Sequence, residues 1–231
     1  MIPIRDEHPT HRTPVVTWLL VGSCVLAYLW QISGGAPGFN RSIFALGVIP
    51  AVLTGRADLA PELTIVPPVA TVFTSMFLHG GLLHLAGNML YLWVFGDNIE
   101  DRLGRVKYLL FYLACGVAAV AAQALPDPGA EVPMVGASGA ISGVLGAYLL
   151  LFPHARIQVI VPVGLLPVRM ALPALVVLGL WFVIQLLSSL ATQPGEGGVA
   201  FRAHIGGFVA GLVAAPFLVR GGLRSARGWR R

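Results

Sequence analysis

Apolar runs of membrane-crossing length alternate along this chain with shorter polar segments. A helix of about 20 apolar residues covers the roughly 30 Å of hydrocarbon in a bilayer. The pattern predicts six spans, at residues 14–32, 82–95, 108–125, 138–152, 171–190 and 203–219. The fourth run is short for a full crossing, as expected if its helix begins inside the bundle. We therefore expect an all-α polytopic membrane protein built as a bundle of six transmembrane helices.

The segments outside these runs complete the expected organisation. Residues 1–13 are predicted to be an N-terminal tail, 14–219 the membrane domain and 220–231 a basic C-terminal tail. A secretory signal peptide is the competing interpretation of the first run, but the run is long for one and has no clear small-x-small cleavage site. Residues 33–81 form a long connection whose apolar patches, at 43–53 and 69–78, are too short to span comfortably. We expect these patches to be interfacial or re-entrant, so that the first loop is partly embedded.

Composition supports a membrane location. Hydrophobic residues make up 56% of the chain and charged residues 11%, with a mean hydropathy of +0.80, whereas soluble domains have about 25% charged residues. The net charge of +5 does not indicate nucleic-acid binding, because the basic residues fall in short loops and a tail. The two cysteines lie inside apolar runs, and no CxxC or HExxH motif is present. We therefore expect no disulfide framework, no metal and no cofactor.

The distribution of basic residues predicts the orientation. With six spans, twelve of the fifteen Lys and Arg residues fall on the side of both termini. The other three are Arg41, Arg56 and Arg202. Basic loops stay in the cytoplasm, so both termini are expected there, and the even-numbered spans begin at the outer face. No Arg- and Ser-rich transit peptide is evident, which favours a bacterial-type plasma membrane.

The fourth run contains a serine placed for chemistry. In VGASGAISGVLGAYLL, at 135–150, small residues recur at helical spacing, which lets helices pack closely. Ser138 stands where the helix should begin, beside free backbone N–H groups and the positive end of the helix dipole. An alkoxide or oxyanion is favoured there. The alternative is that Ser138 is only a small packing residue or a helix cap.

Polar residues in two other spans share the depth of Ser138. His84 and Asn88 are four residues apart near the start of the second span, and so lie on one helix face. His204 lies about one turn inside the sixth span and precedes a GxxxG pair. Polar side chains within spans are costly and often functional. The competing interpretations are core histidines bonded to backbone carbonyls and an asparagine that joins two helices.

These residue types are the parts of a serine hydrolase. His204 can take the Ser138 proton as a general base and return it to a leaving amine. The Asn88 amide, a protonated nitrogen of His84 and the Ser138 backbone N–H can donate to the resulting oxyanion. No Asp or Glu within the spans is placed to orient His204, so we expect a catalytic dyad.

Three motifs resemble those of the rhomboid family of intramembrane serine proteases. They are GASGA at 136–140, HGGLLHLAGNM at 79–89 and AHIGGFVAG at 203–211, and they fall in the fourth, second and sixth spans. The resemblance implies Ser138 as nucleophile, His204 as base, and His84 and Asn88 in the oxyanion site. Gly136, Gly139 and Gly207 belong to the same motifs. It also implies a cavity that opens outward, a fifth span acting as a lateral gate, and single-pass membrane proteins as substrates.

Two positions depart from the family pattern. Some bacterial members have a tyrosine four residues after the nucleophile, stacked on the histidine, where this chain has Ser142. Many members carry Trp-Arg in the first loop, where this chain has Ala70-Thr71. We expect an intramembrane serine endopeptidase whose partners are its substrates and the lipid bilayer. The alternatives are a catalytically inactive relative that binds client helices and a small proton-coupled transporter.

Overall fold

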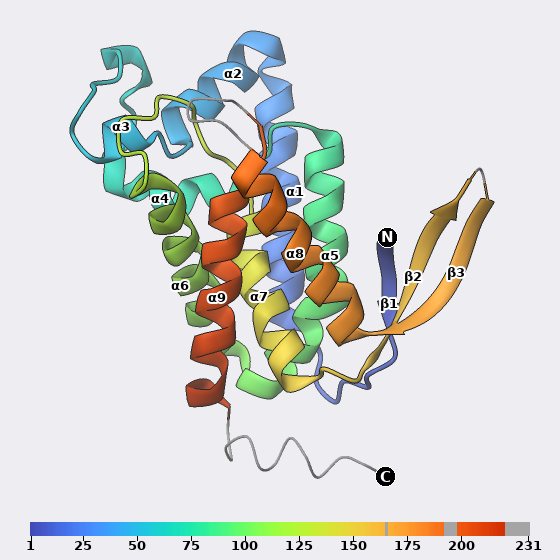
Figure 1. Ribbon diagram of the computed structural model, residues 1–231. Helices are drawn as coiled ribbons and strands as arrows, with labels where there is room; N and C mark the ends of the chain where they lie inside the picture. Colours follow the sequence, from blue (N-terminus) through green and yellow to red (C-terminus); the bar gives the residue numbers. More distant parts are fainter. Residues whose placement is uncertain (165, 192–197, 220–231) are drawn as a thin grey trace.

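The computed structural model describes residues 1–164, 166–191 and 198–219, and its long helices run side by side as one bundle (Figure 1). Each predicted span corresponds to a helix, with ends shifted by a few residues in most cases. The helices are α1 (Val15–Ser33), α5 (Leu82–Leu103), α6 (Arg105–Ala124), α7 (Ser138–Leu151), α8 (Ala174–Ala191) and α9 (Phe201–Leu218).

Helix length and composition identify the candidate spans within the described residues. Four helices, α1, α6, α8 and α9, are long and apolar enough to cross a membrane. The second predicted span qualifies only when α5 is taken with the segment Pro68–Phe77, which meets it at 79°. Helix α5 does not qualify as a span by itself, because its second half is polar. Helix α7 is apolar but shorter, with 14 residues. The chain is thus a mostly helical, multi-pass integral membrane protein.

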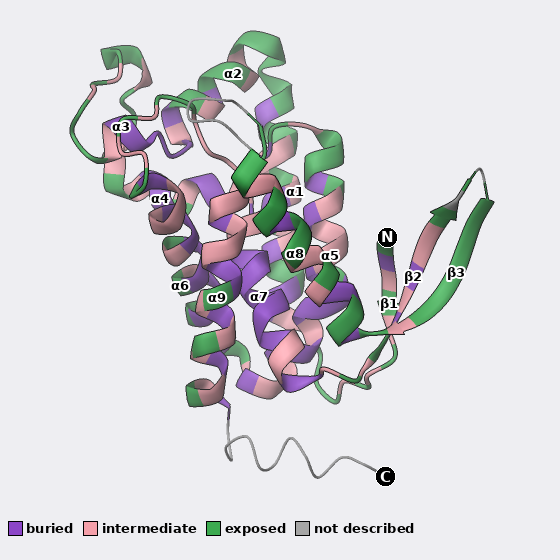
Figure 2. Ribbon diagram, viewed as in Figure 1, coloured by how far each residue is buried: buried purple, intermediate pink, exposed green. Residues whose placement is uncertain are grey.

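Helix α7 occupies the centre of the bundle. It contacts α5, α6, α8 and α9, and Figure 2 shows it buried along most of its length. Glycines allow its close approach to α9, because a Cβ added at Gly207 or Gly211 would overlap a backbone carbonyl of α7. The outer surfaces of α1 and α8 instead expose large apolar side chains, as expected of helices that face lipid.

The connection between α1 and α5 is folded into short helices. These are α2 (Gly35–Leu46), α3 (Pro50–Leu53), η1 (Pro61–Leu63), α4 (Pro68–Thr74) and η2 (Ser75–Phe77). The sharp bend between η2 and α5 fits a broken span or a re-entrant loop, as predicted for the second apolar patch. Backbone hydrogen bonds from Val48 to Met134 and from Gly136 to Ser75 fix the chain just before α7. This connection therefore supports the start of the central helix.

A three-stranded antiparallel sheet is the main departure from the expected all-α fold. Its strands are β1 (Ile2–Asp6), β2 (Arg156–Val163) and β3 (Leu166–Pro173), in the order β1-β2-β3. The segment 1–13, which we expected to be an N-terminal tail, contains the first strand, in which Ile2 pairs with Ile160. A strand whose partner lies about 150 residues away leaves no local signal in so short a segment.

The start of α1, the α5–α6 turn and the end of α9 lie at one end of the bundle (Figure 1), where hydrogen bonds connect them. The buried Glu100 carboxylate accepts hydrogen bonds from the Val16 and Thr17 N–H groups, at 2.9 and 2.8 Å. It thereby satisfies free donors at the positive end of α1. The Lys107 ammonium donates to the Leu218 carbonyl at 3.2 Å. The predicted basic tail, 220–231, lies outside the described residues.

Candidate active site

Ser138 is the first residue of α7, at the end of a turn that only glycine accommodates easily. Gly136 has a φ of +127°, and its N–H donates to the Ser75 carbonyl at 2.8 Å. The chain then enters the helix at Ser138. The first N–H groups of a helix have no acceptor within it, so the Ser138 side chain stands beside unpaired donors.

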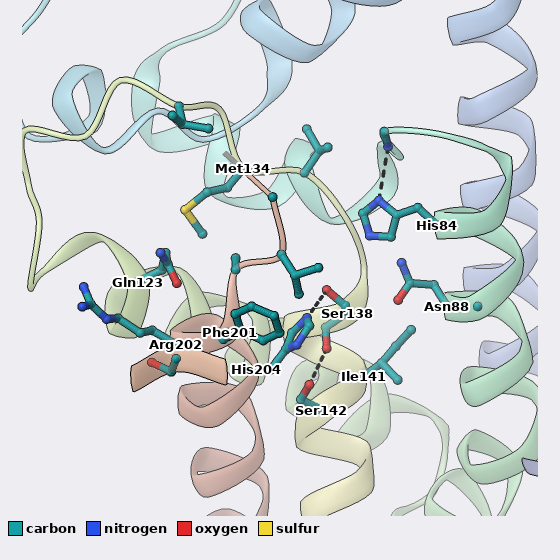
Figure 3. A pocket seen from close by; sticks show the side chains of 18 of the residues that line it. His84, Asn88, Gln123, Met134, Ser138, Ile141, Ser142, Phe201, Arg202 and His204 are labelled. Carbon is teal, nitrogen blue, oxygen red and sulfur yellow. Dashed lines mark hydrogen bonds between the residues drawn. The ribbon is translucent and has the colours of Figure 1, made fainter. Parts of the chain in front are cut away.

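The structure brings Ser138 and His204 together from two different helices. The distance between Ser138 Oγ and His204 Nε2 is 2.8 Å, and Figure 3 shows the hydroxyl and the imidazole facing each other. Their helices are in close contact at two glycine pairs, Gly139 with Gly207 and Gly143 with Gly211. A side chain at Gly207 or Gly211 would overlap the α7 backbone and force the helices apart, so the small-residue pattern determines the separation of the two reactive groups.

The other imidazole nitrogen of His204 also has a partner. His204 Nδ1 lies 2.8 Å from the Oε1 atom of Gln185, a buried side chain on α8. An amide oxygen only accepts hydrogen bonds, so Nδ1 carries the proton. Nε2 is then the unprotonated nitrogen of the neutral ring, and the Ser138 hydroxyl donates to it.

Aromatic rings enclose the imidazole on two sides. The Trp181 ring lies 5.9 Å from the His204 ring at an interplanar angle of 34°, and Phe201 approaches edge-on at 6.5 Å. Ser142, which replaces the tyrosine of some bacterial relatives, points elsewhere and donates to the Ser138 carbonyl at 2.6 Å. The rings next to the imidazole are thus supplied by α8 and by the first residue of α9.

His84 and Asn88 lie opposite Ser138 on α5 (Figure 3). The Gly80 N–H donates to His84 Nδ1 at 3.3 Å, so the neutral ring carries its proton on Nε2. A Cβ built on Gly136 would lie 2.7 Å from that Nε2 and 3.7 Å from Asn88 Nδ2. Both donors therefore face the backbone that leads into Ser138.

Asn88 has an unused donor in this arrangement. Its side chain is 7% exposed, and Nδ2 has no hydrogen-bond partner in the described part of the chain. A buried amide N–H without an acceptor is costly, so its presence beside Ser138 calls for an explanation. His79 Nε2 is also buried without a partner among the described residues, but His79 does not line the cavity described below, and its Nδ1 lies 3.3 Å from the Phe77 carbonyl.

A cavity of about 690 Å³ joins these groups. Its lining includes Ser138, His204, His84, Asn88 and Trp181, together with chain from the connection before α5 and from the segment before α9. The cavity thus lies at the end of the bundle where α5, α7 and α9 begin. A hydroxyl, an imidazole and several free donors around one space can carry out nucleophilic attack on a carbonyl group.

Metal chemistry has no obvious ligand set here. No group of three or more His, Cys, Asp or Glu side chains that could hold a metal ion occurs among residues 1–164, 166–191 and 198–219.

The residue that sequence reasoning overlooked is Gln185. It is a polar side chain inside the apolar run 171–190, and the cost of burying an amide in a span could have identified it.

Comparison with known proteins identifies the family to which a chain with this site belongs. The sequence profile of the Rhomboid domain matches residues 68–221, which is more than half of the chain. The chain belongs to the rhomboid family. The match covers the three motifs and extends over α4 to α9, so the rhomboid fold accounts for the arrangement around the cavity.

Curated rhomboids from distant organisms are similar to this chain. Rhomboid protease GluP of Bacillus subtilis (strain 168) is 28% identical over 206 residues, covering 89% of this chain and 35% of the relative. Rhomboid protein 1, mitochondrial, of Saccharomyces cerevisiae is 32% identical over 186 residues, covering 76% and 50%. The human Presenilin-associated rhomboid-like protein, mitochondrial, is 38% identical over 88 residues, covering 37% and 23%. This rhomboid therefore spans half or less of the length of these relatives.

Proposed function

We propose that this rhomboid is an intramembrane serine endopeptidase that cleaves single-pass transmembrane proteins in or near the membrane. The observation that carries the proposal is the 2.8 Å contact between Ser138 Oγ and His204 Nε2 at the cavity. One of the similar proteins, from Bacillus subtilis, bears the name of a protease. The chemistry proposed here rests on the side chains of this chain alone.

In the first half of the reaction, Ser138 Oγ attacks the carbonyl carbon of the scissile peptide bond. The hydroxyl proton passes to His204 Nε2 as the carbon–oxygen bond forms. The carbonyl oxygen becomes an oxyanion that can accept hydrogen bonds from Asn88 Nδ2, His84 Nε2–H and the Ser138 backbone N–H. The Gly80 N–H orients His84, and the start of α7 fixes the Ser138 N–H, so little reorganisation of these two donors is needed.

In the second half, the tetrahedral intermediate collapses. The carbon–nitrogen bond breaks, and the His204 imidazolium gives its proton to the departing amine. A water molecule then attacks the acyl ester on Ser138 and delivers a proton to His204. Collapse of this second intermediate releases the carboxylic acid, and the proton returns to Ser138 Oγ.

The substrate class follows from the depth of the site. A peptide bond inside a transmembrane helix is shielded by its own hydrogen bonds, so it reaches the serine only where the helix unwinds.

We propose that the cavity opens toward the outer face of a bacterial-type plasma membrane and that the termini are cytoplasmic. Basic side chains such as Arg12 and Lys107 support this orientation, because they lie at the opposite end of the bundle.

A rhomboid-like scaffold that binds client helices without cutting them is the competing function. Such a protein has no need for an aligned nucleophile and base, or for a buried Asn88 amide that no group in the described part of the chain pairs with. A proton-coupled transporter would require charged partners near the histidines. Neither alternative explains why the Gly136 turn presents Ser138 to His204.

Cleavage of a panel of single-pass proteins in liposomes tests the proposal. We expect the wild-type protein to cut at least one of them, and Ser138→Ala and His204→Ala each to abolish cleavage while their thermal unfolding stays close to that of wild type. Ser23→Ala, at an exposed serine of α1, and His154→Ala, at an exposed loop histidine, are matched controls that should retain activity. Full cleavage by the Ser138→Ala protein would eliminate the mechanism.

A further inference from the structure

Within the described residues, Gln185 is the one hydrogen-bond partner that the structure gives to the His204 imidazole besides Ser138. It lies on α8, is 7% exposed, and places Oε1 2.8 Å from His204 Nδ1. A buried amide in an apolar helix is expensive unless its hydrogen bonds are made. Its position therefore calls for an explanation beyond packing.

The orientation of the amide is fixed by a second contact. Gln185 Nε2 lies 3.5 Å from the Trp181 carbonyl, one turn earlier on the same helix. A carbonyl oxygen only accepts, so the NH₂ end of the amide faces Trp181 and the oxygen end faces His204. The oxygen must then accept the Nδ1 proton, which leaves Nε2 free to take the proton of Ser138.

We propose that Gln185 is a positioning residue that holds His204 in the tautomer required of a general base. Resting on the proposed protease function, this inference extends the expected dyad to a chain of three groups supplied by α7, α9 and α8. Without the amide oxygen, the imidazole can carry its proton on Nε2 instead, and that tautomer cannot accept a proton from Ser138.

An amide acts differently from the carboxylate of a conventional triad. It fixes the tautomer and the ring plane, but it carries no charge to stabilise the imidazolium that forms during attack. The Trp181 ring, from the same helix, restricts the imidazole on its face. Helix α8 thus supplies both groups that orient the base, although it supplies neither of the groups that exchange the proton.

Kinetics of Gln185 variants in liposomes test the inference. We expect Gln185→Leu to lower kcat by about tenfold or more, the scale of one buried hydrogen bond, with KM within about twofold of wild type. Gln185→Glu keeps an acceptor oxygen at the same reach, so it should restore kcat to within about threefold. Its carboxylate should move the acidic limb of the pH–rate profile to higher pH by about one unit. Leu187→Ala, at an exposed leucine of α8, is the control and should match wild type.

Nitrogen-15 NMR of histidine-labelled protein provides a readout that does not need turnover. We expect the His204 Nδ1–H tautomer in wild type and a mixture of tautomers in Gln185→Leu. The inference is overturned if Gln185→Leu keeps wild-type kcat, if the Leu and Glu variants are equally impaired, or if wild type holds its proton on Nε2. Ser138→Ala in the same assay separates the two proposals, because cleavage by that variant refutes the protease function itself.

Discussion

The Asn88 amide shows at the scale of one residue how burial can reveal a role. Among the residues that the structure describes, its buried Nδ2 has no partner, although it lies close to the backbone ahead of Ser138. Sequence spacing placed Asn88 and His84 on one helix face, and the structure agrees. Spacing did not reveal that the Gly80 N–H directs the His84 proton toward the cavity, because that contact depends on the turn before α5.

Replacing Asn88 by alanine tests whether this donor acts on the transition state. We expect Asn88→Ala to lower kcat by about 10²–10³, the usual effect of losing one oxyanion donor, without abolishing reaction with a fluorophosphonate. Asn40→Ala, at an exposed position on α2, is the control. Turnover equal to wild type in the liposome assay would remove Asn88 from the oxyanion site.

The contact between α7 and α9 governs the site at the scale of elements. Gly139 and Gly143 on α7 meet Gly207 and Gly211 on α9, and this seam brings Ser138 within reach of His204. The glycine spacing was evident in the sequence, and so were the helices. The sheet was not, because β1 and β2 are far apart in the chain. Gln185 was missed because its role depends on how α8 packs against α9.

A methyl group in this seam should separate the two helices. In Gly211→Ala the added Cβ would overlap the Gly143 carbonyl, which is backbone and cannot move aside. We expect a loss of stability of about 1–3 kcal/mol, typical of overpacking, and a large fall in cleavage. Gly22→Ala on α1 is the matched control, because a Cβ there would meet no described atom within 4 Å. Thermal unfolding in detergent measures both, and equal midpoints for the two variants would contradict the account of the seam.

At the scale of the whole molecule, the N-terminal strand is tied to the bundle end opposite the cavity. Asp6 Oδ2 accepts hydrogen bonds from the Tyr148 hydroxyl and from Asn98 Nδ2, each at 2.7 Å. Burial raises the pKa of Asp6 above its ordinary value and outweighs these hydrogen bonds, which lower it. The folded protein therefore binds a proton at Asp6 more readily than the unfolded chain does.

This shift predicts how stability depends on pH. Because the folded pKa of Asp6 is the higher one, its ionisation costs stability as pH rises through that pKa, and the cost is relieved as pH falls back through it. Asp6→Asn keeps an acceptor for Tyr148 and removes the charge, so its unfolding temperature should vary less over pH 4–7 than that of wild type. Asp58→Asn, at an exposed loop position, should leave the pH dependence unchanged. A curve for Asp6→Asn that coincides with wild type would show that the Asp6 carboxyl is not linked to folding.

The most direct measurement of the central claim is the identity of the residue that a fluorophosphonate modifies. An aligned base should make one serine in this chain reactive, and peptide mass spectrometry of the labelled protein locates it. The account predicts a single adduct on Ser138, absent from Ser138→Ala and strongly reduced in His204→Ala. Labelling that persists in Ser138→Ala, or an adduct on a different serine in the wild-type protein, would contradict it.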